Sequence, residues 1–213
     1  MSKILYPAQY KYLADLVKES DPLIEEIGNF AKQNNVPILS NDSAKFLELL
    51  IKITKPKRVL ELGTAIAYSS IRIARNLKKK SIIHTIEKSQ DNIPVAKENI
   101  DKAGLHDKII IYEGNALEIM PSLPKKYDFI FLDADKADYK KLFDYSIILL
   151  KKGGIIFVDN LLWHGYTASS KVPADMKAST KIIREFNKIF VSQPKLKTTV
   201  LPVGDGIGIG IKE

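Results

Sequence analysis

The stretch RVLELGTAIAYSSIRIARNLKKKSIIHTIE, residues 58–87, decides the fold class. It contains two short apolar runs, 58–62 and 82–86, and between them apolar residues recur at helical spacing. A strand, a helix and a second strand in this order are typical of two parallel strands joined by a crossover helix. The stretch therefore predicts an α/β fold built on a buried parallel sheet.

The same alternation continues toward the C-terminus. Further strands are expected at 109–112, 129–132 and 155–158, and helices at 68–77, 90–103 and 138–150. Two last extended runs, 198–202 and 206–211, are joined by Val203-Gly204-Asp205, which is a hairpin signal. We therefore predict a Rossmann-like, mostly parallel seven-stranded sheet with a C-terminal antiparallel hairpin and helices on both faces.

The N-terminal part shows helical periodicity without strand patterns. Helices are expected at 7–19, 22–34 and 41–53. No internal repeat, low-complexity tract or long linker divides the chain. We therefore expect a single domain over 1–213, in which 1–35 form an N-terminal helical extension.

Composition and charge limit the chemistry. The absence of cysteine excludes disulfides, thiolate metal sites and a cysteine nucleophile, and the three histidines are far apart, so a metal would take oxygen ligands. No apolar run approaches the roughly 20 residues that span a bilayer, and the first residues lack a signal-peptide pattern. We expect a cytoplasmic protein with no membrane partner. The net charge of +8 favours a polyanionic partner such as RNA, although a lysine-rich surface alone would also produce it.

Acidic residues lie at the ends of four of the predicted strands: Glu61, Glu87, Asp133 and Asp159. Ligands of open α/β sheets bind outside the carboxyl ends of the strands. Four carboxylates on one rim would repel one another unless cations or hydroxyl groups satisfy them. A single acid at a strand end is a common loop start, but four in register indicate a binding site.

The first loop and the second strand indicate the cofactor class. Glu87 lies 24 residues after Gly63, close to the roughly 20-residue spacing of an acid that accepts ribose hydroxyls. The loop 63–69 is poor in glycine, and Ala65 and Ala67 would crowd a dinucleotide pyrophosphate. A nucleoside ligand without phosphates fits better, which favours S-adenosylmethionine over a nicotinamide cofactor.

A metal site and a base are expected beside it. Asp133, Asp159 and Asn160 offer hard oxygen ligands suited to magnesium, manganese or calcium. Lys136 follows Asp133 by about one helical turn and could act as a general base. The alternative is that Lys136 is a solvated lysine of the helix start; its position after a strand favours the base.

In these segments the chain resembles class I S-adenosylmethionine-dependent O-methyltransferases of the catechol and caffeoyl-CoA type. The resemblance begins near residue 36 and rests on LELGT (60–64), YS (68–69), IE (86–87), GNA (114–116), FLDADK (131–136) and VDN (158–160). The last two blocks are specific to the metal-dependent branch. Within that branch, VPIL (36–39), 63–74 and PVGDG (202–206) resemble short bacterial enzymes that methylate 5-hydroxyuridine at the tRNA wobble position.

The resemblance implies roles for single residues. S-adenosylmethionine would be bound by Leu39, Glu61, Gly63, Ser69, Glu87, Asn115, Ala116 and Asp133. The alternative for Glu61 is that it orients the Gly63 loop without touching a ligand. Asp133, Asp159 and Asn160 would hold a divalent metal, with Mg²⁺ as the expected ion, and Lys136 would be the catalytic base. Ala67 stands where the family usually has glycine, so its methyl group would lie near the cofactor and lower affinity.

The residues after Asn160 bear on the acceptor. Trp163 or Tyr166 could stack on a flat substrate or serve only in packing, and His164 is expected to be a loop histidine. One face of the next helix is basic, formed by Lys177, Lys181, Arg184 and Lys188. Such a face is usually just solvated, but here it follows the substrate loop and could contact RNA.

Three functions stay open. The first is methylation of the 5-OH of 5-hydroxyuridine in the tRNA anticodon region, which gives 5-methoxyuridine. The second is O-methylation of catechol-type small molecules, and the third is a non-catalytic RNA-binding relative. The resemblance also implies a homodimer, and the two N-terminal helices are candidates for its interface or for a substrate lid.

Overall fold

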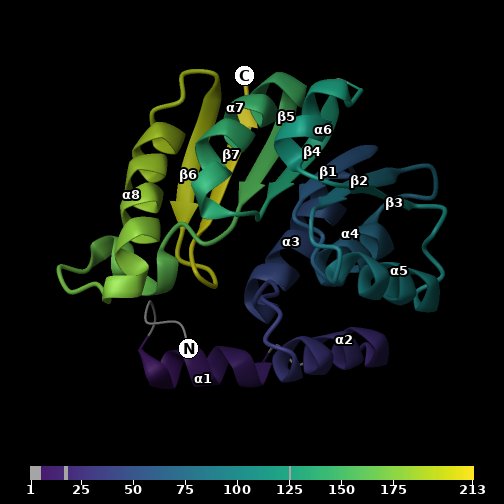
Figure 1. The fold of residues 1–213 in the computed structure, drawn as a ribbon, viewed down its shortest axis with the longest axis horizontal. Helices are drawn as coiled ribbons and strands as arrows, with labels where there is room; N and C mark the ends of the chain where they lie inside the picture. Colours follow the sequence, from purple (N-terminus) through teal and green to yellow (C-terminus); the bar gives the residue numbers. More distant parts are fainter. Residues whose placement is uncertain (1–5, 17–18, 125) are drawn as a thin grey trace.

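The computed structural model describes residues 6–16, 19–124 and 126–213, and seven strands of these residues form one twisted sheet (Figure 1). The strands are β1 (Arg58–Leu62), β2 (Ile82–Glu87), β3 (Ile109–Glu113), β4 (Tyr127–Leu132), β5 (Leu150–Val158), β6 (Leu196–Leu201) and β7 (Ile207–Lys212). Their order is β3-β2-β1-β4-β5-β7-β6, and β7 alone runs antiparallel to its neighbours. The predicted parallel sheet and its C-terminal hairpin are confirmed.

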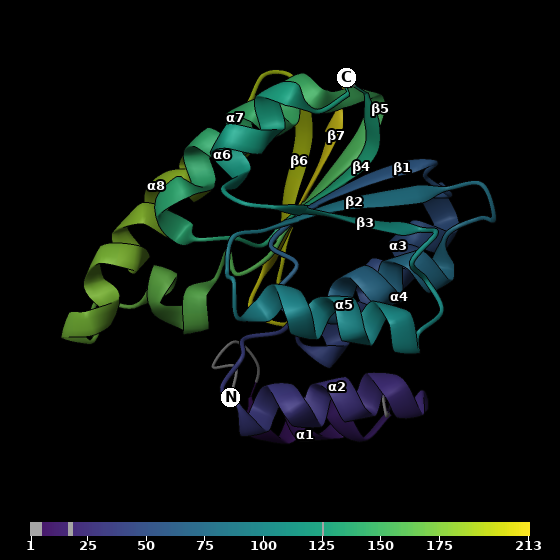
Figure 2. The same ribbon diagram turned by 45° about the vertical axis from the view of Figure 1, so that its right-hand side comes forward.

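Helices cover both faces of the sheet (Figure 2). One layer holds α3 (Asn41–Thr54), α4 (Tyr68–Asn76) and α5 (Asn92–Lys102), and the other holds α6 (Ala116–Ile119), α7 (Tyr139–Leu149) and α8 (Lys177–Val191). Outside the first layer lie α1 (Pro7–Leu16) and α2 (Pro22–Gln33). The helix predicted over 7–19 ends at Leu16, and residues 17 and 18 lie outside the described part.

The sheet divides the core in two, because successive side chains of a strand point to opposite faces. Val59 and Phe129 belong to the core under α2–α5, whereas Leu60 and Ile130 belong to the core under α6–α8. All four are fully buried. Both faces of the sheet are covered, which explains why the strands read as continuous apolar runs rather than as alternating ones.

The strand β5 is longer than predicted. It begins at Leu150 and includes Lys151, Lys152, Gly153 and Gly154, none of which signals a strand by itself. The extension forms because Leu150 pairs with Tyr127 of β4, across a register shift that precedes Phe129. Pairing with β4 therefore decides the start of β5, and local propensity does not.

The N-terminal helices differ from each other. In α2 the side chains of Ile24, Ile27 and Ala31 are buried in the core, whereas α1 has no buried residue. Of the N-terminal extension expected over 1–35, α2 therefore packs into the core, whereas α1 does not. Among the described helices none is both long and apolar enough to cross a membrane.

Candidate functional site

A cavity of about 550 Å³ lies at the carboxyl ends of the strands, next to the point between β1 and β4 where the strand order reverses. It is lined by residues 37–39, 63–65, 68–69, 86–88, 114–116, 133–136, 138, 142, 159–160 and 163–164. Every predicted site residue except Glu61 lines this cavity. Residues far apart in sequence thus meet at one edge of the sheet, which we call the site edge.

Glu61 is placed differently from the expectation that it binds cofactor. Its side chain is fully buried and points to the α4 side of the sheet, because its neighbours Leu60 and Leu62 face the other way. The carboxylate accepts hydrogen bonds from the hydroxyls of Ser69 (2.5 Å), Thr85 (2.6 Å) and Ser70. Burial raises the pKa of Glu61 to about 7 despite these hydrogen bonds. Glu61 therefore anchors the first turn of α4.

Gly63 allows the ends of β1 and β4 to approach each other. Its φ is +102°, and a Cβ at this position would lie 2.0 Å from the carbonyl oxygen of Asp133. The Asp133 N–H in turn donates to the carbonyl of Leu62 over 3.1 Å. Only glycine fits this position, so the requirement for Gly63 is structural as well as a matter of ligand access.

Glu87 presents a fixed carboxylate to the cavity. One of its oxygens accepts from the Ala65 N–H at 2.7 Å, and the other accepts from the Ser89 N–H at 2.8 Å. A carboxylate has about four acceptor positions, so capacity for ligand hydroxyls remains. Nearby, Asn115 caps α6 by accepting from the Leu117 N–H, and it also borders the cavity.

The methyl group of Ala67 does not face the cavity, where the family resemblance would put it. It adopts a left-handed conformation with φ of +67°, directly before α4. Its side chain is fully buried in the core beneath α4 and does not line the cavity. The methyl group therefore adds backbone strain rather than crowding a ligand.

The ammonium group of Lys136 lies among oxygen atoms at the start of η2 (Lys136–Asp138). Its Nζ donates to Asp133 Oδ1 at 3.1 Å, to Asn160 Oδ1 at 2.7 Å and to the Tyr139 hydroxyl at 2.5 Å. Only 13% of the Lys136 side chain is exposed. Two of the three predicted metal ligands are therefore already arranged around one positive charge.

The third predicted ligand, Asp159, is an unsatisfied buried acid. Its Oδ1 has no hydrogen-bond partner among the described residues, and burial together with the nearby Asp133 carboxylate raises its pKa above the usual range. Within the described chain no three His, Cys, Asp or Glu side chains are grouped so as to hold a metal. A metal here would therefore need the amide oxygen of Asn160, and this hard oxygen set fits Mg²⁺.

Sequence reasoning missed Asp205, which lies in the turn between β6 and β7. Its Oδ1 accepts from the backbone N–H of His164 at 2.6 Å, and its Oδ2 lies 3.5 Å from the Asn160 amide nitrogen. Burial raises the pKa of Asp205. The segment PVGDG (202–206) predicts a turn and supports the subgroup resemblance, but neither inference assigns a role to Asp205.

The loop after β5 contains η3 (Trp163–Ala168) and is held by α8. The Trp163 indole N–H donates to Ser179 over 3.1 Å, and the indole also lines the cavity. Arg184 donates to three backbone carbonyls of this loop, those of Tyr166, Thr167 and Ser169. The basic face predicted on α8 is therefore not simply an RNA-facing surface, because its arginine holds the loop. Tyr166 does not line the cavity.

Comparison with known proteins agrees with this geometry. A family model described as O-methyltransferase matches residues 14–213. The chain belongs to the O-methyltransferase family. The predicted resemblance to S-adenosylmethionine-dependent O-methyltransferases is confirmed at this level.

Relatives of this O-methyltransferase cover most of its length. It is 31% identical to catechol O-methyltransferase of Niastella koreensis, over 100% of the chain and 96% of the relative. It is 34% identical to caffeoyl-CoA O-methyltransferase 2 of Petunia hybrida, over 94% of the chain and 88% of the relative.

Solved structures share the fold of this O-methyltransferase. The Bacillus cereus O-methyltransferase in complex with SAH has a TM-score of 0.83 and 28% identity, covering 96% of this chain and 97% of that one. A structure from Staphylococcus aureus has a TM-score of 0.90 and 34% identity, covering 97% and 100%.

The cavity of the O-methyltransferase is acidic. Glu87, Asp133, Asp135, Asp138 and Asp159 line it, against only two lysines, Lys88 and Lys136. Such an excess of carboxylates is unfavourable for an anionic ligand and favourable for cations. A divalent metal and a sulfonium cofactor carry the charge that would balance it.

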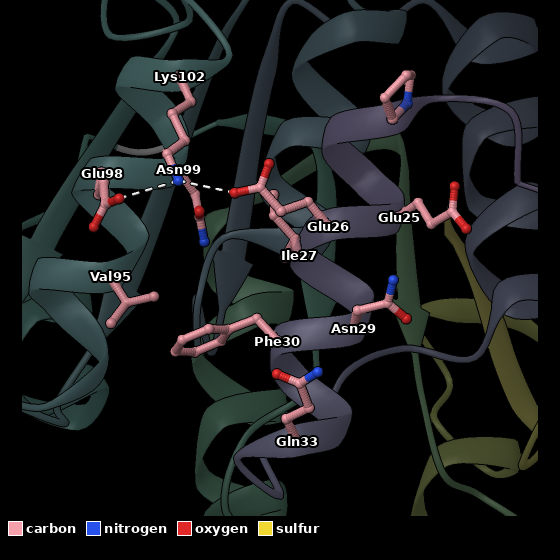
Figure 3. Close-up of a pocket in the computed structure, with 11 residues that line it drawn as sticks. Glu25, Glu26, Ile27, Asn29, Phe30, Gln33, Val95, Glu98, Asn99 and Lys102 are labelled. Carbon is pink, nitrogen blue, oxygen red and sulfur yellow. Dashed lines mark hydrogen bonds and ion pairs between the residues drawn. The ribbon is translucent and has the colours of Figure 1, made fainter.

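A second cavity of the O-methyltransferase lies between α2 and α5 (Figure 3). At its margin Lys102 forms ion pairs with Glu26 (2.9 Å) and Glu98 (3.1 Å). Phe30 and Val95 provide apolar lining. The ion pair with Glu26 fastens α2 to α5, and the remaining side chains do not converge on a common point in the way that those at the site edge do.

Proposed function

We propose that this protein transfers the methyl group of S-adenosylmethionine to a hydroxyl group held by a divalent metal ion. The proposal is carried by one observation. Lys136 Nζ lies between Asp133 and Asn160, beside the buried Asp159, in the same cavity that Gly63 and Glu87 line. The proposed metal ligands and the proposed cofactor residues thus line one cavity.

The methionine end of the cofactor is assigned to Leu39, Gly63 and Ser69, which line one part of the cavity. Glu87 would accept the two ribose hydroxyls, since the backbone N–H donors of its own loop already fix its orientation. Asn115 and Ala116 would border the adenine. Glu61 acts on this arrangement through the Ser69 hydroxyl and, by way of Thr85, through Thr64.

Asp133, Asp159 and Asn160 would hold Mg²⁺, which when bound lowers the pKa of the acceptor hydroxyl and fixes its position. Lys136 would be the base: its Nζ, which has to be a neutral amine for this step, would take the hydroxyl proton as the acceptor oxygen attacks the methyl carbon. The new O–CH₃ bond would form while the S–CH₃ bond breaks, and the electron pair of that bond would stay on sulfur. The acidic lining stabilises the cationic cofactor before transfer.

The acceptor we propose is the 5-OH of 5-hydroxyuridine at the tRNA wobble position. Its O4 carbonyl is adjacent to the hydroxyl, so both oxygens can chelate one ion. The subgroup resemblance of 36–39, 63–74 and 202–206 supports this choice. Trp163, which is held by a hydrogen bond from its indole N–H to Ser179, offers a flat surface for a base.

A catechol is the second candidate, because its two adjacent hydroxyls chelate in the same way. Relatives named catechol and caffeoyl-CoA O-methyltransferases favour it. The acidic lining also suits a neutral acceptor better than a polyanion.

One experiment separates these acceptors. The purified protein is incubated with labelled S-adenosylmethionine, Mg²⁺ and either tRNA carrying 5-hydroxyuridine or a simple catechol. Nucleoside mass spectrometry should then detect 5-methoxyuridine in the tRNA. Transfer to the catechol alone would replace the tRNA proposal, and cofactor binding without transfer to either would indicate a non-catalytic relative.

A homodimer is also part of the proposal. The helix α1 buries none of its side chains, and Tyr12 and Leu16 expose 65% and 62% of their surface. Light scattering during gel filtration would give the mass, and a 24 kDa particle at micromolar concentration would contradict the dimer.

A further inference from the structure

The two edges of the sheet carry opposite charge. At the end where the parallel strands begin, the described residues of 55–58, 77–82, 103–109, 123–128, 149–153, 192–197 and 211–213 form what we call the basic edge. These segments hold thirteen Lys and Arg against three Asp and Glu. At the site edge, the segments 63–68, 87–92, 113–119, 133–139, 159–165 and 201–206 hold nine Asp and Glu against two lysines.

This asymmetry is not what a uniformly lysine-rich surface would give. The whole chain has 33 Lys and Arg against 25 Asp and Glu, an excess of 8. The basic edge alone has an excess of 10, thirteen less three. The rest of the chain is therefore slightly acidic, and the net positive charge comes entirely from one end of the sheet.

Most of these side chains are free to bind a ligand. Four are engaged within the protein: Arg58 over the Tyr127 ring, Lys108 and Lys212 with backbone carbonyls, and Lys151 with Asp128. The other nine are exposed lysines, including Lys78, Lys79 and Lys80, with no ion pair to any described residue. Unpaired like charges held close together raise the local potential, which a polyanion would relieve.

The arrangement suits an extended anion. Adjacent strands lie roughly 4.8 Å apart, so a row of strand starts across seven strands spans about 29 Å. Lysines rather than arginines dominate, and lysine acts as a point charge without planar bidentate geometry. The exposed aromatic side chains, Tyr6, Tyr12 and Phe30, lie in or next to the N-terminal helices and not at this edge. Base stacking and aromatic anchoring in a lipid interface are therefore both disfavoured there.

We propose that the basic edge binds the phosphodiester backbone of RNA, at the end of the protein opposite to the methyl-transfer site. Contacts with phosphates position an RNA without reading its sequence. The acidic site edge repels phosphates, so an RNA held at the basic edge would offer the site only an unpaired base. This role in substrate binding rests on the proposed tRNA acceptor, whereas the binding itself does not.

The test uses the intact protein and a fluorescent tRNA transcript. Anisotropy gives the Kd of the wild type between 50 and 200 mM salt, and of two triple variants. The first carries Lys78→Gln, Lys79→Gln and Lys80→Gln in the basic edge, and the matched control carries Lys177→Gln, Lys181→Gln and Lys188→Gln on α8. The control variant tests the alternative basic surface with the same change of charge.

We expect the basic-edge variant to bind at least 10-fold more weakly. Three lost phosphate contacts should also reduce the slope of log K against log salt by about 2 to 3. The control should keep the wild-type Kd within twofold. Equal losses in both variants, or no tRNA binding by the wild type, would overturn the proposal. So would binding to phosphatidylserine vesicles by a protein that does not bind tRNA.

Binding of S-adenosylmethionine distinguishes this proposal from the proposed function. The basic-edge variant should bind S-adenosylmethionine with the wild-type Kd, because no residue of 78–80 lines the site. Loss of tRNA binding by this variant would support the surface even if the wild type methylated no tRNA. In that event the acceptor proposal alone would fail.

Discussion

Lys136 donates a hydrogen bond from Nζ to Oδ1 of Asn160 over 2.7 Å, which joins the loop after β4 to the loop after β5. The same nitrogen lies 3.1 Å from Oδ1 of Asp133. The proposed base and two proposed metal ligands therefore form one cluster. A substitution in this cluster is therefore informative only if its measurement distinguishes the loss of the base from the loss of metal binding.

Replacing Lys136 tests the base. Lys136→Met keeps a chain of similar length without an amine, and general-base catalysis contributes roughly 10²–10⁴-fold. We expect kcat to fall by that factor while the Kd for S-adenosylmethionine, measured by calorimetry, changes less than threefold. Lys136→Arg is the control, since guanidinium keeps the charge but cannot give up its proton. Full activity of the arginine variant would show that only the charge matters.

Asp205→Ala tests the positioning of Asn160. Without this carboxylate, the Asn160 amide and the His164 N–H lose their acceptor, so the Asn160 oxygen is held less firmly. Removing a residue that hydrogen-bonds to a metal ligand typically lowers metal affinity 10–100-fold. We expect the Mg²⁺ concentration for half-maximal activity to rise about 10-fold, with kcat largely recovered at saturating Mg²⁺. Asp175→Ala, at an exposed position in η4 (Ala174–Met176), should leave the titration unchanged. An unaltered Mg²⁺ titration in the Asp205 variant would refute the role.

Glu61→Gln tests the buried carboxyl through stability. The pKa of Glu61 is raised from 4.5 to about 7 by burial, so between these pH values the unfolded chain loses this proton and the native protein keeps it. The contribution of Glu61 to the free energy of unfolding is thus present below pH 4.5 and is lost as the pH rises to 7, by roughly 3 kcal/mol. Gln carries no titrating proton. Urea unfolding at pH 5 and pH 8 should show that the free energy of unfolding of the variant rises relative to that of the wild type at the higher pH. The same difference between variant and wild type at both pH values would contradict the account.

Ala67→Gly tests whether the methyl group affects the cofactor. Glycine relieves the left-handed strain at φ +67°, worth about 1–2 kcal/mol, but loses a buried methyl and adds freedom to the unfolded chain. These terms oppose each other, so we expect the free energy of unfolding to change by less than about 1 kcal/mol. Calorimetry should give a Kd for S-adenosylmethionine within twofold of the wild type. Tenfold tighter binding would mean that the methyl group does crowd the cofactor.

The fold was predictable because its strands are buried on both faces and therefore read as apolar runs. The start of β5 was not, since Lys151, Lys152, Gly153 and Gly154 become a strand only by pairing near Tyr127. Local pattern specifies an element that packs on all sides. It does not specify an extension that depends on a partner strand.

The cavity-lining residues were predictable because parallel strands bring their ends to one edge. Asp205 was not, because its contact with His164 arises from the pairing of β5 with β7, which brings Gly208 opposite Val158. For Glu61, alternation along β1 puts the side chain on the face opposite Leu60 and Leu62, which favours the alternative that it orients the loop rather than touching a ligand. The charge asymmetry could also have been found, because lysines precede most of the predicted strands.

The requirement for a metal is the central claim, and methyl transfer after chelation tests it most directly. The protein is treated with EDTA, dialysed, and assayed with labelled S-adenosylmethionine and each acceptor, with and without added Mg²⁺. We predict no transfer above background without metal, full recovery with Mg²⁺, and no recovery in Asp159→Ala that still binds cofactor. Undiminished transfer by the chelated wild type would contradict the account.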